Sequence, residues 1–198
     1  MSFTAKDVSE LRARTGAGMM DCKKALQETN GDMEKAVEYL RTKGIAKAEK
    51  RAGKATSEGL IGSYVHHNGK IAVLVELNCE TDFVARTDDF KELSRLVAEH
   101  IAAAAPLGVD RDSVPSDTVE RERAIFVEQV RASGKPENLI EKIVEGKVEA
   151  YYKDVALLHQ AWVREPKKSI GDLVKETSAK VGENIVVRRF ARFQLGEA

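Results

Sequence analysis

The chain reads Gly59-Leu-Ile-Gly-Ser-Tyr-Val-His-His-Asn-Gly-Lys-Ile-Ala-Val-Leu-Val-Glu-Leu-Asn78, and this stretch decides the fold. Asn68-Gly69 stands between two runs rich in β-branched and aromatic residues, which is typical of a β-hairpin with a two-residue turn. Such a turn fixes the register, so one largely apolar set of side chains shares a face that lies in a core. The facing pairs are His66 with Ile71, Tyr64 with Val73, Gly62 with Val75, and Leu60 with Leu77.

Helices are expected between this hairpin and a final strand. Apolar residues recur with the helical period in four segments of the helical middle, residues 88–181, and Asp88 or Asp89 can cap the first of them. Residues 184–195 then alternate between apolar and polar side chains, as a half-buried strand does. Together these elements predict an α+β core over residues 54–198, with helices covering one side of a small antiparallel sheet.

The first 53 residues are expected to form a separate unit. Their helical periodicity stops at Gly16, Gly31 and Gly44, which predicts three short helices. Residues 45–58 carry basic side chains without a regular apolar face, so we interpret them as a solvated helix or a tether. A three-helix bundle of this size is too small for catalysis but is well suited to docking.

The residues after the hairpin, Asn78-Cys-Glu-Thr-Asp-Phe-Val-Ala-Arg86, place an apolar pair where the chain should turn polar. Phe83-Val84 lies on a short acidic connection before the next helix. One interpretation is that Phe83 packs back onto its own helix, as isolated apolar loop residues usually do. The other is that Phe83 is a wedge that enters another molecule.

Composition limits the kinds of partner. The chain has 198 residues with 32 Lys and Arg and 32 Asp and Glu, so no net charge attracts nucleic acid or an anionic membrane. No run approaches the roughly 18 apolar residues of a membrane span. Cys22 and Cys79 stand far apart, which fits structural thiols in a reducing compartment. We therefore expect a cytoplasmic protein that contacts neither membrane nor nucleic acid.

Catalytic and cofactor sites have little support. His66 and His67 should point to opposite faces of a strand, so they could not share a metal, and a Cys79 nucleophile would lie far from either imidazole. No glycine-rich loop with phosphate-binding spacing occurs. The sequence predicts no enzyme activity, no metal and no cofactor.

Two further features allow two interpretations each. Arg188, Arg189 and Arg192 lie among aromatic residues, which suits either RNA binding or the wet face of an edge strand, and the zero net charge favours the edge strand. Met19 and Met20 are adjacent at a helix start, so they cannot both face the bundle core and one should be exposed.

Two long motifs resemble the bacterial elongation factor Ts family. They are Thr15-Gly-Ala-Gly-Met-Met-Asp-Cys-Lys-Lys-Ala-Leu26 and the stretch from Asn78 to Arg86. Shorter matches at Gly134-Lys-Pro136, Ile143-Val-Glu-Gly146 and Gly182-Glu-Asn-Ile-Val-Val-Arg-Arg-Phe190 extend the resemblance over essentially the whole chain. The length is similar to the short class with one core subdomain, and the resemblance implies that the N-terminal bundle is UBA-like.

The resemblance implies a guanine nucleotide exchange factor for elongation factor Tu in translation elongation, which binds both GDP-bound and nucleotide-free Tu. Phe83 would enter the Tu G domain near its magnesium site, with Thr81, Asp82 and Val84 fixing the approach, so that magnesium and phosphate contacts are displaced, GDP leaves and GTP can bind. The resemblance also implies a second hold on Tu through Arg12, Met19, Met20 and Lys23.

The resemblance further implies a homodimer through the late strand. Ala191 stands within that strand and no cysteine follows Cys79, so such a dimer is expected to be noncovalent. Two alternative functions remain, an RNA-binding module that uses Lys47 to Lys54 and the late arginines, and a protein-docking adapter without exchange activity.

Overall fold

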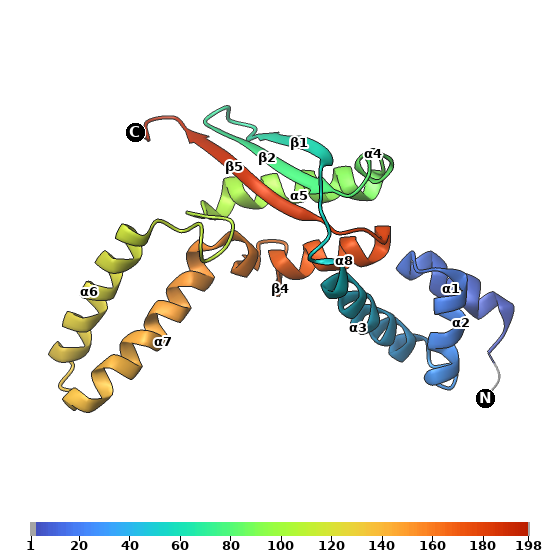
Figure 1. Ribbon diagram of the computed structural model, residues 1–198, viewed down its shortest axis with the longest axis horizontal. Helices are drawn as coiled ribbons and strands as arrows, with labels where there is room; N and C mark the ends of the chain where they lie inside the picture. The colour runs from blue at the N-terminus through green and yellow to red at the C-terminus, as the bar shows by residue number, and fades with distance from the viewer. Residues whose placement is uncertain (1–2, 198) are drawn as a thin grey trace. The chain divides into compact units, whose positions relative to one another are not determined.

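The computed structural model describes residues 3–197, apart from the side chains of residues 45 and 47–49 (Figure 1). It has the α+β composition expected from the sequence. The helices are α1 (Ala5–Thr15), α2 (Met19–Glu28), α3 (Met33–Arg51), α4 (Asp82–Ala85), α5 (Asp88–Ala104), α6 (Ser116–Ala132), α7 (Glu137–Val155), the 3-10 helix η1 (Leu157–His159) and α8 (Ile170–Val181). The strands are β1 (Glu58–Val65), β2 (Ile71–Cys79), β3 (Ala161–Trp162), β4 (Glu165–Ser169) and β5 (Val186–Gln194).

The chain divides into two compact units. The first comprises the residues up to Gly59 together with Asn78–Phe90 and Val174–Val186. The second comprises Leu60–Leu77, Lys91–Leu173 and the residues from Val187 onward. The sequence places a domain boundary between residues 53 and 54, on the expectation that the two parts fold independently. That boundary stays a prediction.

The N-terminal helices form the expected three-helix bundle within the first unit (Figure 1). Thr4 caps α1, because its hydroxyl accepts a hydrogen bond from the Asp7 amide at 3.3 Å while the Asp7 carboxylate accepts one from the Thr4 amide at 2.6 Å. Helix α1 ends at Gly16, whose φ of +68° favours glycine. The buried residues between the three helices are Val8, Leu11, Cys22, Ala25, Leu26 and Ala36.

The expected end of the third helix at Gly44 is wrong, because α3 continues to Arg51. The glycine serves close packing instead, since a Cβ on Gly44 would lie 2.9 Å from the Cβ of Ala179 in α8. Arg41, almost one turn earlier, pairs with Glu176 of α8 at 2.6 Å. The first part of the expected linker is therefore helical, and α3 is held against α8.

The hairpin pairs His66 with Ile71 as expected, but its connection is longer than the expected two-residue turn. The His66 amide donates to the Ile71 carbonyl at 2.9 Å. The chain reverses over His66 to Gly69, where the Gly69 amide donates to the His66 carbonyl at 2.8 Å and Gly69 has a φ of +69°. The Asn68 side chain accepts from the backbone amide two residues on at 2.9 Å, which stabilises this longer connection. His67 therefore lies in the turn and not in a strand.

Strand β5 completes a three-stranded sheet of order β1-β2-β5 and lies at its edge, so the late strand is an edge strand as expected. Helix α5 runs along one face of this sheet (Figure 1). A Cβ on Gly62 of β1 would lie 1.8 Å from Oγ of Ser94 in α5, and Arg192 of β5 donates to the Ala102 carbonyl of α5 at 3.4 Å. The buried residues of β2 are Val73, Val75, Leu77 and Cys79.

The second unit also contains the helical hairpin α6–α7 (Figure 1). Its turn passes through Gly134 with a φ of +70°. Beyond α7, β3 and β4 pair as a small antiparallel sheet that interrupts the helical middle expected over residues 88–181. The sequence did not predict this pair because the two residues of β3 are too few to show an alternating pattern. The buried residues between α6 and α7 are Val130, Ile140, Val144 and Val148.

Candidate functional site

Residues 78–86 end strand β2 and then form the one-turn helix α4. The Thr81 hydroxyl accepts from the Val84 amide at 3.4 Å, and the Thr81 carbonyl accepts from the Ala85 amide at 3.3 Å. Ala85 is buried, whereas Phe83 is 77% exposed. The interpretation in which Phe83 packs back onto its own helix is therefore wrong.

A second cap follows directly. The expectation that Asp88 or Asp89 caps α5 is wrong, because both lie in its first turn and Thr87 takes the capping place. The Thr87 hydroxyl accepts from the Phe90 amide at 3.3 Å and donates to the Val84 carbonyl at 2.7 Å. Helix α4 is thus fixed at both of its ends.

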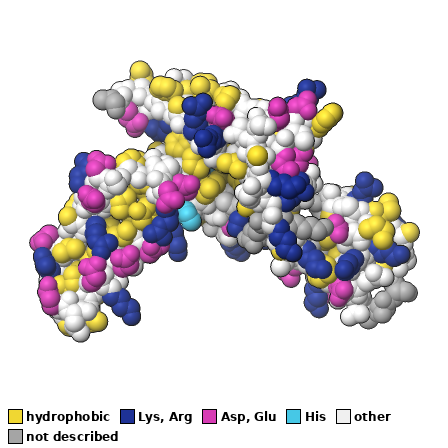
Figure 2. Space-filling view, in the orientation of Figure 1, with side chains coloured by type: hydrophobic (Ala, Val, Ile, Leu, Met, Phe, Trp, Pro, Cys, Tyr) yellow, Lys and Arg dark blue, Asp and Glu magenta, His cyan; other side chains and the backbone are white. Residues whose placement is uncertain are grey.

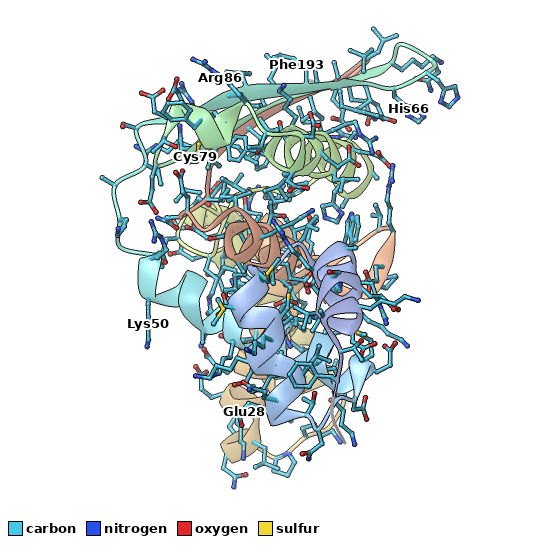
Figure 3. The ribbon with its side chains drawn as sticks, turned by 90° about the vertical axis from the view of Figure 1, so that its right-hand side faces the viewer. Glu28, Lys50, His66, Cys79, Arg86 and Phe193 are labelled. Carbon is cyan, nitrogen blue, oxygen red and sulfur yellow. The ribbon has the colours of Figure 1, made fainter. Side chains whose placement is uncertain are left out.

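Polar contacts also surround α4. Arg86 pairs with Asp82 at 2.6 Å on the exposed side. The buried Cys79 thiol donates to the Thr81 carbonyl at 3.1 Å. Burial, and then the negative charge of Glu183, raise the pKa of this thiol above its usual value, so it remains protonated and structural. Figure 3 shows Cys79 and Arg86 on opposite sides of this turn.

Glu80, just before α4, is tied to two other segments of the first unit. It accepts hydrogen bonds from Nε and Nη2 of Arg51 at 3.0 and 2.9 Å, and from the Asn184 amide at 2.7 Å. The Arg51 bond, followed by the Asn184 bond, holds the pKa of the Glu80 carboxyl below its usual value. Sequence reasoning missed the contacts among these residues and Glu183, although Glu80 lies in the motif from Asn78 to Arg86 and Glu183 and Asn184 lie in the motif that begins at Gly182.

The bundle residues singled out from the sequence lie at the surface of the same unit. Met19 is 55% exposed and Met20 is 74% exposed, which confirms the expectation that the two do not both face the bundle core. Gly18 precedes the first turn of α2, and both methionines lie in that turn outside the face that Cys22, Ala25 and Leu26 bury. Arg12 and Lys23 are also exposed.

The residues with described side chains hold no group of three or more histidine, cysteine, aspartate or glutamate side chains placed to bind a metal. The expectation that His66 and His67 point apart is wrong, because their ring centroids lie 4.2 Å from each other. His67 lies in the turn, and His66 bonds through Nδ1 to the Tyr64 hydroxyl at 2.9 Å. None of the helices within residues 3–197 is long and apolar enough to cross a bilayer.

Two of the three late arginines form ion pairs within the second unit. Arg189 pairs with Glu76 at 2.6 Å, and Arg192 pairs with Glu197 at 2.9 Å. On the face drawn in Figure 2, basic and acidic side chains are interspersed over both units. A continuous basic groove for a nucleic-acid backbone is not visible on that face.

The sheet face opposite α5 carries exposed apolar side chains. On β2, Leu74 alternates with the buried Val73 and Val75, and Figure 3 places Phe193 of β5 on the side of the sheet away from α5. Phe193 is 64% exposed. We call this surface the outer sheet face. Its exposed large apolar residues within the strands are Ile61, Val65, Leu74 and Phe193.

Comparison with known proteins identifies the family. Residues 4–197 match the family described as elongation factor TS. An elongation factor Ts from Fervidobacterium nodosum is 60% identical over 197 residues, with 100% of both chains covered. One from Oleidesulfovibrio alaskensis is 58% identical over 195 residues, with 98% of each covered. One from Citrifermentans bemidjiense is 56% identical over 197 residues, which are 100% of this chain and 91% of that relative. The chain belongs to the elongation factor Ts family, whose role is in translation elongation.

Proposed function

We propose that the chain is a guanine nucleotide exchange factor for elongation factor Tu, and that it acts in the cytoplasm by binding alone, without enzyme activity or a cofactor. The observation that carries this proposal is the 77% exposed Phe83 on a one-turn helix fixed at both ends. Family membership supports Tu as the partner.

A fixed apolar wedge suits nucleotide release. A GTPase holds GDP through its phosphate loop and a magnesium ion on the phosphate oxygens, so release is slow until these supports are displaced. Phe83 would displace them, while Thr81, Asp82 and Val84 set its direction. Release that is about a thousandfold faster needs ~4 kcal/mol of differential stabilisation, so several contacts must contribute. If the factor lowers the affinity of Tu for a nucleotide, the nucleotide lowers the affinity of Tu for the factor by the same ratio. Incoming GTP therefore releases the factor from Tu.

The bundle would supply a hold that does not depend on the nucleotide. Met19 and Met20 present flexible apolar side chains, and Arg12 and Lys23 present cations on the same unit as Phe83. A hold of this kind would keep the factor on Tu both before and after GDP leaves.

A second copy of the chain would cover the outer sheet face. Two copies of one apolar face can pack against each other across a two-fold axis, and several exposed apolar side chains on one face are typical of an interface. Cys22 and Cys79 are both buried, so the homodimer would be noncovalent.

The direct test is release of a fluorescent GDP analogue from elongation factor Tu with excess unlabelled nucleotide. We expect the release rate to rise with the concentration of the chain and to saturate. Binding to Tu without faster release would favour the docking adapter. Tight binding to bare RNA that weakens steeply with salt, together with unchanged GDP release, would favour the RNA-binding module.

A further inference from the structure

The carboxylate of Glu183 binds the start of helix α4 from a segment about a hundred residues away in sequence. Its Oε2 accepts hydrogen bonds from the amides of Glu80 at 3.1 Å and Thr81 at 3.0 Å, and its Oε1 accepts one from the Thr81 hydroxyl at 2.7 Å. One side chain therefore satisfies three donors at the point where β2 turns into α4. A carboxylate that accepts several backbone hydrogen bonds fixes the backbone more firmly than a neutral acceptor does.

The Thr81 hydroxyl links Glu183 to the cap of α4. Its hydrogen is directed to Glu183, which leaves its oxygen to accept the Val84 amide at 3.4 Å. Helix α4 has four residues, too few to be stable by its own hydrogen bonds. The direction in which Phe83 points therefore depends on how Thr81 is held.

Glu183 is itself firmly placed. The Ser178 hydroxyl donates to the Glu183 carbonyl, and the next residue, Asn184, donates from its amide to Glu80 at 2.7 Å and from its side chain to the Lys54 carbonyl at 2.9 Å. The segments around Glu80 and Glu183 therefore hold each other in place. The Glu183 carboxylate accepts from the Glu80 and Thr81 amides, and the Glu80 carboxylate accepts from the Asn184 amide.

We propose that Glu183 is a positioning residue for nucleotide exchange, which holds Thr81 so that α4 presents Phe83 to the GTPase. The inference rests on the proposed function. If Phe83 is already held in its bound direction, no binding free energy is lost in ordering it when the GTPase binds. Without Glu183, the short helix frays and Phe83 loses its fixed direction, while the bundle surface stays intact. Loss of Glu183 therefore lowers the release rate at saturating factor and leaves the half-saturating concentration nearly unchanged.

The test measures GDP release from elongation factor Tu over a range of factor concentrations for wild type, Glu183→Ala, Phe83→Ala and the double variant. We expect Glu183→Ala to lower the maximal release rate about tenfold, with less than a threefold change in the half-saturating concentration. In the Phe83→Ala background, Glu183→Ala should cause no further loss, because the residue acts through Phe83. Glu149→Ala is the matched control, since Glu149 of α7 is also a paired carboxylate, 2.7 Å from Arg111.

Several outcomes would overturn the inference. A maximal rate equal to wild type, a loss confined to the half-saturating concentration, or a full additional loss in the double variant would each assign Glu183 no positioning role. Should Glu183→Ala fail to fold, Glu183→Gln keeps the shape of the side chain and carries the same test. If wild type accelerates release and Glu183→Ala matches it, only this inference is overturned. If wild type itself does not accelerate release, the proposed function fails and the inference is overturned with it.

Discussion

The ring of His100 donates a hydrogen bond from Nε2 to Oε1 of Gln160 across 2.9 Å, and both side chains are buried. The Gln160 side-chain nitrogen donates to the carbonyls of Asp154 at 2.7 Å and Ala104 at 3.3 Å, so its oxygen faces the ring. Nδ1 of His100 accepts from the Val163 amide at 3.4 Å. A neutral imidazole satisfies both bonds, whereas a protonated one would set N–H against N–H at Val163.

This arrangement predicts a loss of stability in mild acid. Burial lowers the pKa of His100 below the ordinary value of 6.5. Below that pH the unfolded chain binds a proton that the folded chain resists, so stability is complete above about pH 6.5 and falls as the pH drops toward the folded-state pKa. Melting followed by the fluorescence of Trp162, the only tryptophan, should show a larger drop between about pH 7.5 and about pH 5.5 for wild type than for His100→Gln.

The exposed His67 gives the control for that measurement. His67→Gln should keep the acid sensitivity of wild type. If wild type and His100→Gln lost equal stability over the same pH range, His100 would not be the source of the effect.

Two glycines in helices should respond oppositely to the same substitution. Around Gly146 in α7 a Cβ would meet no atom within 4 Å, so Gly146→Ala should gain about 1 kcal/mol of stability from helix propensity. At Gly44 the Cβ would lie 2.9 Å from that of Ala179, so Gly44→Ala should lose about 1 kcal/mol through overpacking against α8. Denaturant unfolding followed by circular dichroism measures both. A gain at Gly44 equal to that at Gly146 would show that α3 and α8 do not pack closely.

The outer sheet face should govern self-association. Phe193→Asp places a charge among exposed apolar side chains, so sedimentation equilibrium should show a shift from dimer to monomer, with dimer affinity reduced at least about tenfold, or ~1.4 kcal/mol. Ile125→Asp is the matched control, because Ile125 is an exposed apolar residue of α6. A monomeric wild type would contradict the proposed homodimer. An unchanged dimer in Phe193→Asp would show that the outer sheet face is not its interface.

Much of the fold could be predicted from local features of the sequence. The Asn68-Gly69 pair located the hairpin. Asp32, just before α3, caps that helix through a local contact, with its carboxylate accepting from the Lys35 amide at 3.1 Å. The alternation after Gly182 located the late strand. Each of these features depends on residues that are neighbours in the sequence or face each other across one turn.

The missed features depend on contacts between distant segments. Gly44 reads as a helix stop until Ala179 of α8 is placed beside it, and nothing near either residue in sequence announces that contact. Glu183 reads as part of a loop before a strand, although its carboxylate binds Thr81 about a hundred residues earlier. The exposure of Phe83 could be proposed from the sequence but not decided, because Thr81, which caps α4, is itself held by Glu183 about a hundred residues later.

The central claim is that Phe83 drives nucleotide release. Because its side chain is 77% exposed, Phe83→Ala removes little buried surface and should leave the melting temperature nearly unchanged. The matched control is Leu139→Ala, since Leu139 is a 43% exposed residue of α7. Both variants should fold and bind elongation factor Tu.

The decisive measurement is the maximal release rate of a fluorescent GDP analogue from elongation factor Tu at saturating factor. The account predicts that wild type and Leu139→Ala accelerate release equally, while Phe83→Ala is slower by about tenfold or more, or ~1.4 kcal/mol of lost differential stabilisation. Equal acceleration by Phe83→Ala and wild type would contradict the account and move the exchange mechanism to the bundle surface.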